Sequence, residues 1–254
     1  MTPTNPTTIN DTDVGEVAAD LPNVGRGALG AAGLAGVAYT LCMFFTSPDG
    51  PPVATATAQQ VRDHVTSNGT TIQVAAIGGM LGITAALIFF AALTRQVRDR
   101  LPRSLLGDVV FSSGLLVVIY QWLMTTADAM TTLLPNLVGS DVKRVDDTTL
   151  RGWYGLTGFT HFMGDLAVVP MTVVMASFSV AALRGGLLPN WLSWAGLVFS
   201  AAGAIGIVGI LAAVDALYAF WFIAMFGYWS WILAIAITCL IRRRRRDSPS
   251  VASA

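Results

Sequence analysis

The sequence has little charge. Asp, Glu, Lys and Arg make up 12% of its 254 residues, whereas 54% are hydrophobic and the mean hydropathy is +0.63. Soluble domains carry about 25% charged residues, and a soluble chain this apolar would expose large sticky patches. The formal net charge is zero, so nothing pulls the chain toward nucleic acid. The composition therefore predicts a protein whose main solvent is the lipid bilayer.

Cysteine, histidine and catalytic motifs are also scarce. The two cysteines, Cys42 and Cys239, lie in separate apolar runs that place them near opposite membrane faces, so we expect no disulfide. With two histidines there is no bis-histidine haem pair, and no HExxH, GxSxG, P-loop or CxxC motif occurs. We therefore expect no cofactor and no resident metal ion.

Long apolar runs dominate what is present. A window of about 19 residues finds six stretches long enough to cross roughly 30 Å of hydrocarbon. They predict an all-α fold, a polytopic membrane helix bundle with six transmembrane helices within residues 28–241. Residues 1–27 are predicted to be a disordered cytoplasmic tail and residues 242–254 a basic cytoplasmic tail. The six predicted spans are 28–47, 72–94, 104–130, 152–183, 190–213 and 216–241.

The basic residues predict the orientation. If the N-terminus is cytoplasmic, most arginines fall inside, and only Arg62, Lys143, Arg144 and Arg151 fall outside. We therefore expect a multi-pass protein of a bacterial inner (plasma) membrane with both termini cytoplasmic. The run RRRRR after the last span reads as an orientation signal, and it could also dock anionic lipid headgroups. Its members are Arg242, Arg243, Arg244, Arg245 and Arg246.

The stretch TATAQQVRDHVTSNG precedes the second span. Thr57 is placed to cap a helix, and Val61 and Val65 would share one helical face. Gly69 is placed to end the helix. We expect a short surface helix that lies on the outer leaflet.

The stretch THFMGDLAVVP, residues 160–170, places two ionisable groups in an apolar run. His161 and Asp165 are four residues apart and so share one helix face. Pro170 cannot donate to the carbonyl of Leu166, which predicts a kink one turn below the pair. Ionisable groups in hydrocarbon are costly and usually face a bundle interior or water.

Depth counting adds neighbours to this pair. We predict one polar cluster near the midplane, in which Gln121 lies level with His161, and Tyr228, Ser230 and Thr84 lie level with or near Asp165. Three interpretations stay open. The cluster could be a structural clasp between helices, a proton-linked or ligand-binding site, or a metal site.

The layout resembles an uncharacterised family of bacterial integral membrane proteins with about six spans. The likeness is carried by ATAQQVRDHVTSNG, LTRQVRDRL and LRGGLLPNWLSWAGLV and covers roughly residues 28–240. Since that family has no assigned activity, the resemblance implies a fold and no site residues. The sequence favours an accessory or structural membrane protein, with lipid and another membrane protein as partners. The alternatives are a small proton-linked transporter or ligand-binding protein that uses His161 and Asp165, and a metal-dependent intramembrane hydrolase.

Overall fold

The computed structural model describes residues 24–43, 50–137 and 142–247, and within these ranges the chain is helical with no strand. A predicted tail, residues 1–27, falls mostly outside the described residues, although helix α2 already begins at Val24. The helices run in the order α2 (Val24–Cys42), α3 (Ala58–Arg100), α4 (Leu106–Leu137), η1 (Val142–Arg144), α5 (Asp147–Leu166), α6 (Val168–Gly185), α7 (Asn190–Ala212) and α8 (Asp215–Asp247).

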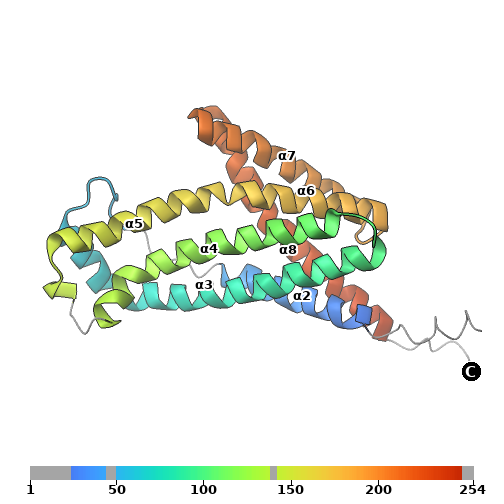
Figure 1. Cartoon of the computed structure of the whole chain (residues 1–254), viewed down its shortest axis with the longest axis horizontal. Helices are drawn as coiled ribbons and strands as arrows, with labels where there is room; N and C mark the ends of the chain where they lie inside the picture. Colours follow the sequence, from blue (N-terminus) through green and yellow to red (C-terminus); the bar gives the residue numbers. More distant parts are fainter. Residues whose placement is uncertain (1–23, 44–49, 138–141, 248–254) are drawn as a thin grey trace, which may run out of the picture.

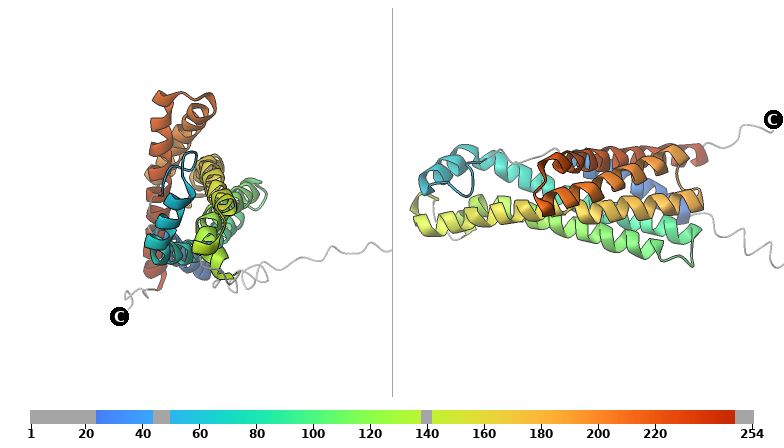
Figure 2. Two further views of the ribbon diagram at one scale, coloured as in Figure 1. Left: turned by 90° about the vertical axis from the view of Figure 1, so that its left-hand side faces the viewer. Right: turned by 90° about the horizontal axis from the view of Figure 1, so that it is seen from above.

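The helices form a closed bundle. Helix α2 packs on α3, α3 on α4, α4 on α6, α6 on α7, α7 on α8, and α8 returns to α2. The α7–α8 hairpin leans away from the others, and its turn projects from the bundle (Figures 1 and 2). Large side chains fill the centre, where Phe89, Phe90, Phe178 and Trp231 are almost wholly buried.

Five helical segments are long and apolar enough to cross a membrane, which is consistent with a multi-pass membrane protein. The described apolar part of α2, Gly27–Cys42, is shorter than such a span, so the predicted six spans become five in this structure. Residues 44–47, the end of the predicted first span, lie outside the described residues. The five segments are Ala58–Arg100, Leu106–Ala127, Asp147–Gly185, Asn190–Ala212 and Asp215–Arg245.

Helix α3 is much longer than a membrane requires. Its 43 residues extend for about 64 Å, whereas the hydrocarbon core is about 30 Å thick. Thr57 caps its start as the sequence predicted, in a capping box with Gln60. The prediction that Gly69 ends this helix is wrong, because α3 continues through Gly69 to Arg100. An isolated glycine inside a helix costs only about 1 kcal/mol, which packing of Val61 and Val65 offsets.

The first part of α3 is therefore the beginning of one long helix and not a separate short helix. It lies beside the start of α5, at the end of the molecule that also holds the end of α4 and η1 (Figures 1 and 2). A second, small core joins the two helices there. It consists of Ala56, Val61, Val65, Leu150 and Tyr154. We call residues 50–71 and 142–154 the distal unit.

The opposite end of the bundle collects the turns that carry arginine. The start of α2, the α3–α4 and α6–α7 turns and the end of α8 all lie there (Figure 1). Helix α8 does not stop where the last predicted span does, because it continues through the arginine run to Asp247. Part of the predicted basic tail is therefore helical. We call this the basic end.

Near the predicted kink the helix is interrupted at one residue. Helix α5 ends at Leu166, α6 begins at Val168, and Ala167 joins them three residues before Pro170. The Ala167 amide donates to the carbonyl of Gly164, a tight turn that replaces regular α-helical bonding. Pro170 lies in the first turn of α6, where a missing N–H costs least.

Candidate functional site

The His161–Asp165 pair lies at the break between α5 and α6. His161 is exposed on the surface of the bundle, and Asp165 is half-buried and within electrostatic range of His161 and Tyr218. The indole nitrogen of Trp221 on α8 donates to the backbone carbonyl of Asp165 at 3.1 Å. A side chain of α8 thus satisfies a backbone carbonyl at the break. The two ionisable side chains lie at the margin of the bundle.

Two other predicted residues lie in the centre of the bundle. The hydroxyl of Tyr39 on α2 donates to Gln121 Oε1 on α4 at 2.9 Å and lies 3.2 Å from the hydroxyl of Tyr228 on α8. All three side chains are buried. Gln121 and Tyr228 therefore meet through Tyr39, which the sequence analysis missed. Tyr39 is the one tyrosine of the first apolar run, and a search for hydroxyls in every span would have found it.

The remaining members of the predicted cluster lie elsewhere. Thr84 and Ser230 are exposed, and each hydroxyl donates to the carbonyl four residues earlier in its own helix, Met80 and Phe226 respectively. Such bonds satisfy a hydroxyl without any partner helix. The prediction of one cluster containing Gln121, His161, Asp165, Tyr228, Ser230 and Thr84 is corrected to a buried trio and a separate pair. The depth count could not show which way each helix face points.

The side chains of the buried trio are suited to holding helices together by hydrogen bonds. It consists of two phenols and one amide, so it contains no group that is charged near neutral pH. Its members come from three different helices and bond to one another. Polar side chains that bond across helices fix their mutual register in an apolar bundle.

Metal ligands do not gather in the described ranges. No group of three or more His, Cys, Asp or Glu side chains lies close enough there to hold a metal ion. The two free cysteines are apart, with Cys42 on α2 and Cys239 on α8. The predicted metal-dependent alternative gains no support from this arrangement.

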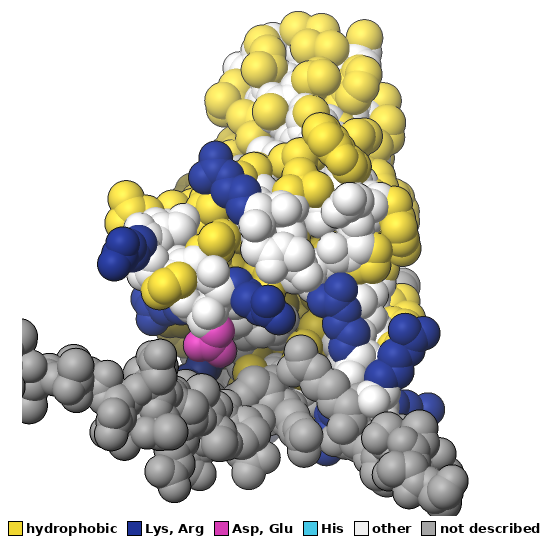
Figure 3. Space-filling model, turned by 90° about the vertical axis from the view of Figure 1, so that its right-hand side faces the viewer, with side chains coloured by type: hydrophobic (Ala, Val, Ile, Leu, Met, Phe, Trp, Pro, Cys, Tyr) yellow, Lys and Arg dark blue, Asp and Glu magenta, His cyan; other side chains and the backbone are white. Residues whose placement is uncertain are grey.

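Within the arginine run at the basic end, two side chains contact neighbouring helices or turns and two others are exposed. Arg242 donates to the backbone carbonyl of Leu187 in the α6–α7 turn, and the side chain of Arg243 lies against Gly30 of α2. These two arginines join α8 to its neighbours. Arg244 and Arg245 are exposed, and the basic side chains visible on this end of the molecule in Figure 3 outnumber the acidic ones. The side chain of Arg246 lies outside the described residues.

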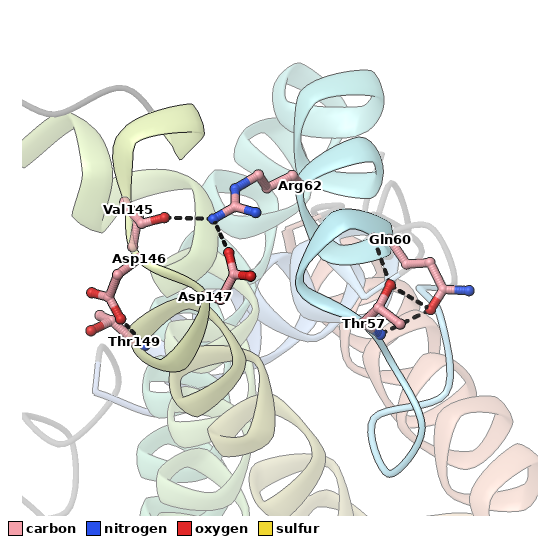
Figure 4. A network of polar contacts seen from close by, with 7 residues as sticks. All are labelled: Thr57, Gln60, Arg62, Val145, Asp146, Asp147 and Thr149. Atoms are coloured by element: carbon pink, nitrogen blue, oxygen red, sulfur yellow. Dashed lines mark hydrogen bonds and ion pairs between the residues drawn. The ribbon is translucent and has the colours of Figure 1, made fainter.

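The distal unit contains a network of polar contacts that joins α3 to the start of α5 (Figure 4). Arg62 on α3 donates through Nη2 to Asp147 Oδ1 at 2.6 Å and to the carbonyl of Val145 at 2.6 Å. The Arg62 side chain is only 17% exposed, whereas that of Asp147 is 73% exposed. One guanidinium therefore ties α3 to the turn that precedes α5.

Asp146 fixes the start of α5. Its carboxylate accepts a hydrogen bond from the backbone N–H of Thr149 at 2.9 Å, which makes it the N-cap of the helix. Hydrogen bonds from the side chain and backbone of Thr149 lower the pKa of Asp146 below its usual value, because they stabilise the charged form. Two turns further along α5, the hydroxyl of Tyr154 donates to the carbonyl of Pro51 at 2.6 Å. This bond joins α5 to the segment before α3.

No protein-family model, curated protein or solved structure matches the chain. The resemblance to a six-span bacterial family therefore stays a prediction, and function has to be argued from the geometry.

Proposed function

We propose that the chain is an accessory protein of a bacterial inner membrane, with both termini in the cytoplasm. In this role the helix bundle anchors the distal unit outside the bilayer, where it binds another membrane protein. The observation that carries the proposal is the length of α3, whose 43 residues support a helical projection well beyond the hydrocarbon core.

The construction of the distal unit supports this role. A segment that merely connected two spans would need neither a core nor a buried arginine. Here Val61 and Leu150 are fully buried, and Arg62 joins two segments that are 83 residues apart in the sequence. A rigid, folded projection presents a fixed surface, and binding to such a surface requires little ordering.

The bundle itself supports an accessory role over transport. Its central polar trio is closed on itself and contains no ionisable group that changes charge near neutral pH. Ionisable groups near a bilayer midplane are the usual mark of an ion or proton pathway. The His161–Asp165 pair lies at the margin of the bundle instead.

Site-specific photocrosslinking in cells would test the proposal. A photoreactive amino acid at exposed Gln59 or Asp63, on the distal unit, should give a discrete protein adduct of higher mass. The same amino acid at Leu81, an exposed apolar position on the membrane-spanning part of α3, is the matched control and should give lipid adducts only. If a scan of the exposed distal positions yields no protein adduct, the proposal fails.

The second candidate is a proton-linked or ligand-binding role for the pair. The observation in its favour is the position of a half-buried Asp165 beside His161 at a helix break, where a backbone carbonyl is also bound by a side chain. Proteoliposomes with an imposed pH gradient would test it. A proton flux that Asp165→Asn abolishes and Asp108→Asn leaves intact would replace the accessory role with this one.

A further inference from the structure

The distal unit contains a cavity of about 320 Å³ that none of the roles above uses. It lies between the segment before α3 and the first two turns of α5. Pockets for small ligands start at about this size. Its walls include the side chains of Val53, Ala56, Val61, Thr148 and Arg151 and the backbone of Gly152.

The cavity wall carries one carboxylate, that of Asp147, and one guanidinium, that of Arg151. The carboxylate of Asp147 is paired with Arg62, which does not line the cavity. Arg151, one turn further along α5, is exposed at the edge of the cavity and forms no ion pair with any residue that the structure describes. The cavity also borders the N-terminal turns of α5, where the aligned peptide dipoles favour a negative charge.

The remaining wall is apolar. Val61 is fully buried and Ala56 nearly so, and both belong to the small core of the distal unit. A ligand that matches both walls needs one negative group and a hydrocarbon body.

We propose that this cavity binds a small organic carboxylate. The guanidinium of Arg151 donates to the carboxylate oxygens, with the Thr148 hydroxyl as a further donor, and the hydrocarbon part packs against Val53, Ala56 and Val61. Arginine suits this task because its planar fork of donors matches a carboxylate. The inference goes beyond the proposed function, since it holds whether or not the distal unit binds another protein.

Calorimetry on the purified full chain in detergent tests the site, with hexanoate as the probe. Hexanamide has the same hydrocarbon body without the charge and serves as the matched ligand. We expect saturable binding of hexanoate with at least about tenfold weaker binding of hexanamide, because the charge-assisted bonds to Arg151 are lost.

Two variants locate the binding, each with a control. Arg151→Gln removes the cation, and Arg103→Gln removes an exposed arginine at the basic end. Gly152→Leu fills the cavity, because a Cβ built at Gly152 meets no atom within 4 Å. Gly155→Leu is its match, since Gly155 lies on the same helix with equal open space but does not line the cavity.

We expect Arg151→Gln and Gly152→Leu to raise the Kd for hexanoate at least about tenfold, while both controls bind like the wild type. The proposal is overturned if hexanoate shows no saturable binding to the wild type. It is equally overturned if hexanamide binds as tightly as hexanoate, or if Gly152→Leu binds as well as Gly155→Leu.

Discussion

The hydroxyl of Tyr39 donates to the amide oxygen of Gln121 at 2.9 Å, although the two residues are 82 positions apart in the sequence. This bond joins α2 to α4 through the centre of the bundle. The same hydroxyl lies 3.2 Å from that of Tyr228 on α8, so one phenol joins three helices. The described apolar part of α2, Gly27–Cys42, is shorter than a membrane span, and the bond fixes its depth relative to α4.

Tyr39→Phe should destabilise the bundle by about 1–3 kcal/mol, because it leaves the buried oxygen of Gln121 without a donor. Hydrogen bonds between membrane helices are often weaker, near 0.6 kcal/mol, so the lower part of this range is expected. Reversible unfolding in detergent, measured by far-UV circular dichroism, provides the free energy of unfolding.

A double-mutant cycle with Gln121→Leu separates the bond from the loss of packing. We expect a coupling energy of at least about 0.5 kcal/mol between the two positions. Tyr120→Phe removes a hydroxyl from the neighbouring position on α4 and is the control. Equal losses in Tyr39→Phe and Tyr120→Phe would show that the hydroxyl of Tyr39 has no special role.

Much of the fold could be predicted from local chemistry. Helix positions followed from apolar runs, the start of α3 from the Thr57 cap, and the break at Ala167 from Pro170. Each of these signals acts within about one helical turn, so the sequence displays it directly. The error at Gly69 arose because contacts of Val61 and Val65 with α5 extend the helix, and such contacts are not local.

The candidate site could be predicted only in part. Depth along a helix can be counted from the sequence, and two members of the predicted cluster, Gln121 and Tyr228, do meet through Tyr39. The direction of a helix face depends on packing, which is why Thr84 and Ser230 were wrongly assigned to the centre of the bundle. Tyr39 was missed because attention rested on ionisable groups, whereas the buried network consists of neutral ones.

Arg62→Met should destabilise the distal unit by about 1–3 kcal/mol. It removes an ion pair with Asp147 and also leaves the carbonyl of Val145 without its donor. Hydrogen exchange of the backbone amides in residues 142–154 measures the local effect, and faster exchange should be confined to the distal unit.

The matched control is Arg98→Met at the basic end. Arg98 pairs with Asp108 at 2.5 Å, but both side chains are more than half exposed, so the loss should stay within about 1 kcal/mol. If Arg98→Met costs as much as Arg62→Met, the burial of Arg62 has no part in its effect.

The start of α5 should lose protection in acid. Because the folded-state pKa of Asp146 lies below its unfolded value, its cap stabilises α5 fully above the usual pKa of aspartate, about 3.9. The stabilisation is lost as the pH falls through the lower folded-state pKa. Amide exchange in the first turn of α5, followed from neutral pH into acid, should show this loss.

Asp146→Asn supplies the comparison. Asparagine caps a helix about as well as aspartate but does not titrate, so the difference from the wild type should appear only in acid. Identical pH profiles of the two proteins would mean that the charge of Asp146 does not contribute to the cap.

His161→Ala should leave stability within about 0.5 kcal/mol of the wild type, because the exposed imidazole interacts with Asp165 through solvent-screened electrostatics, and a screened pair four residues apart on a helix contributes little. Trp221→Phe should cost more, about 1 kcal/mol, since it removes the donor that binds the carbonyl of Asp165 at the helix break. Thermal unfolding in detergent compares the two. A large loss in His161→Ala would restore the interpretation of the pair as a structural clasp.

Gly206→Ala should loosen the α7–α8 hairpin. A Cβ at this position would lie 2.6 Å from the backbone nitrogen of Trp221 and 2.8 Å from its Cα, so two helix backbones would have to separate. Overpacking of this kind costs about 1–3 kcal/mol.

Gly155→Ala is the control, because its Cβ would meet no atom within 4 Å and the change should stabilise α5 by about 0.5–1 kcal/mol. The two variants differ by the same methyl group in a helix, so opposite shifts in the melting temperature would assign the loss to the α7–α8 approach. If Gly206→Ala instead raises the melting temperature, separating α7 from α8 costs no stability. The hydrogen bond from Trp221 to the Asp165 carbonyl would then not depend on the close approach of these two helices.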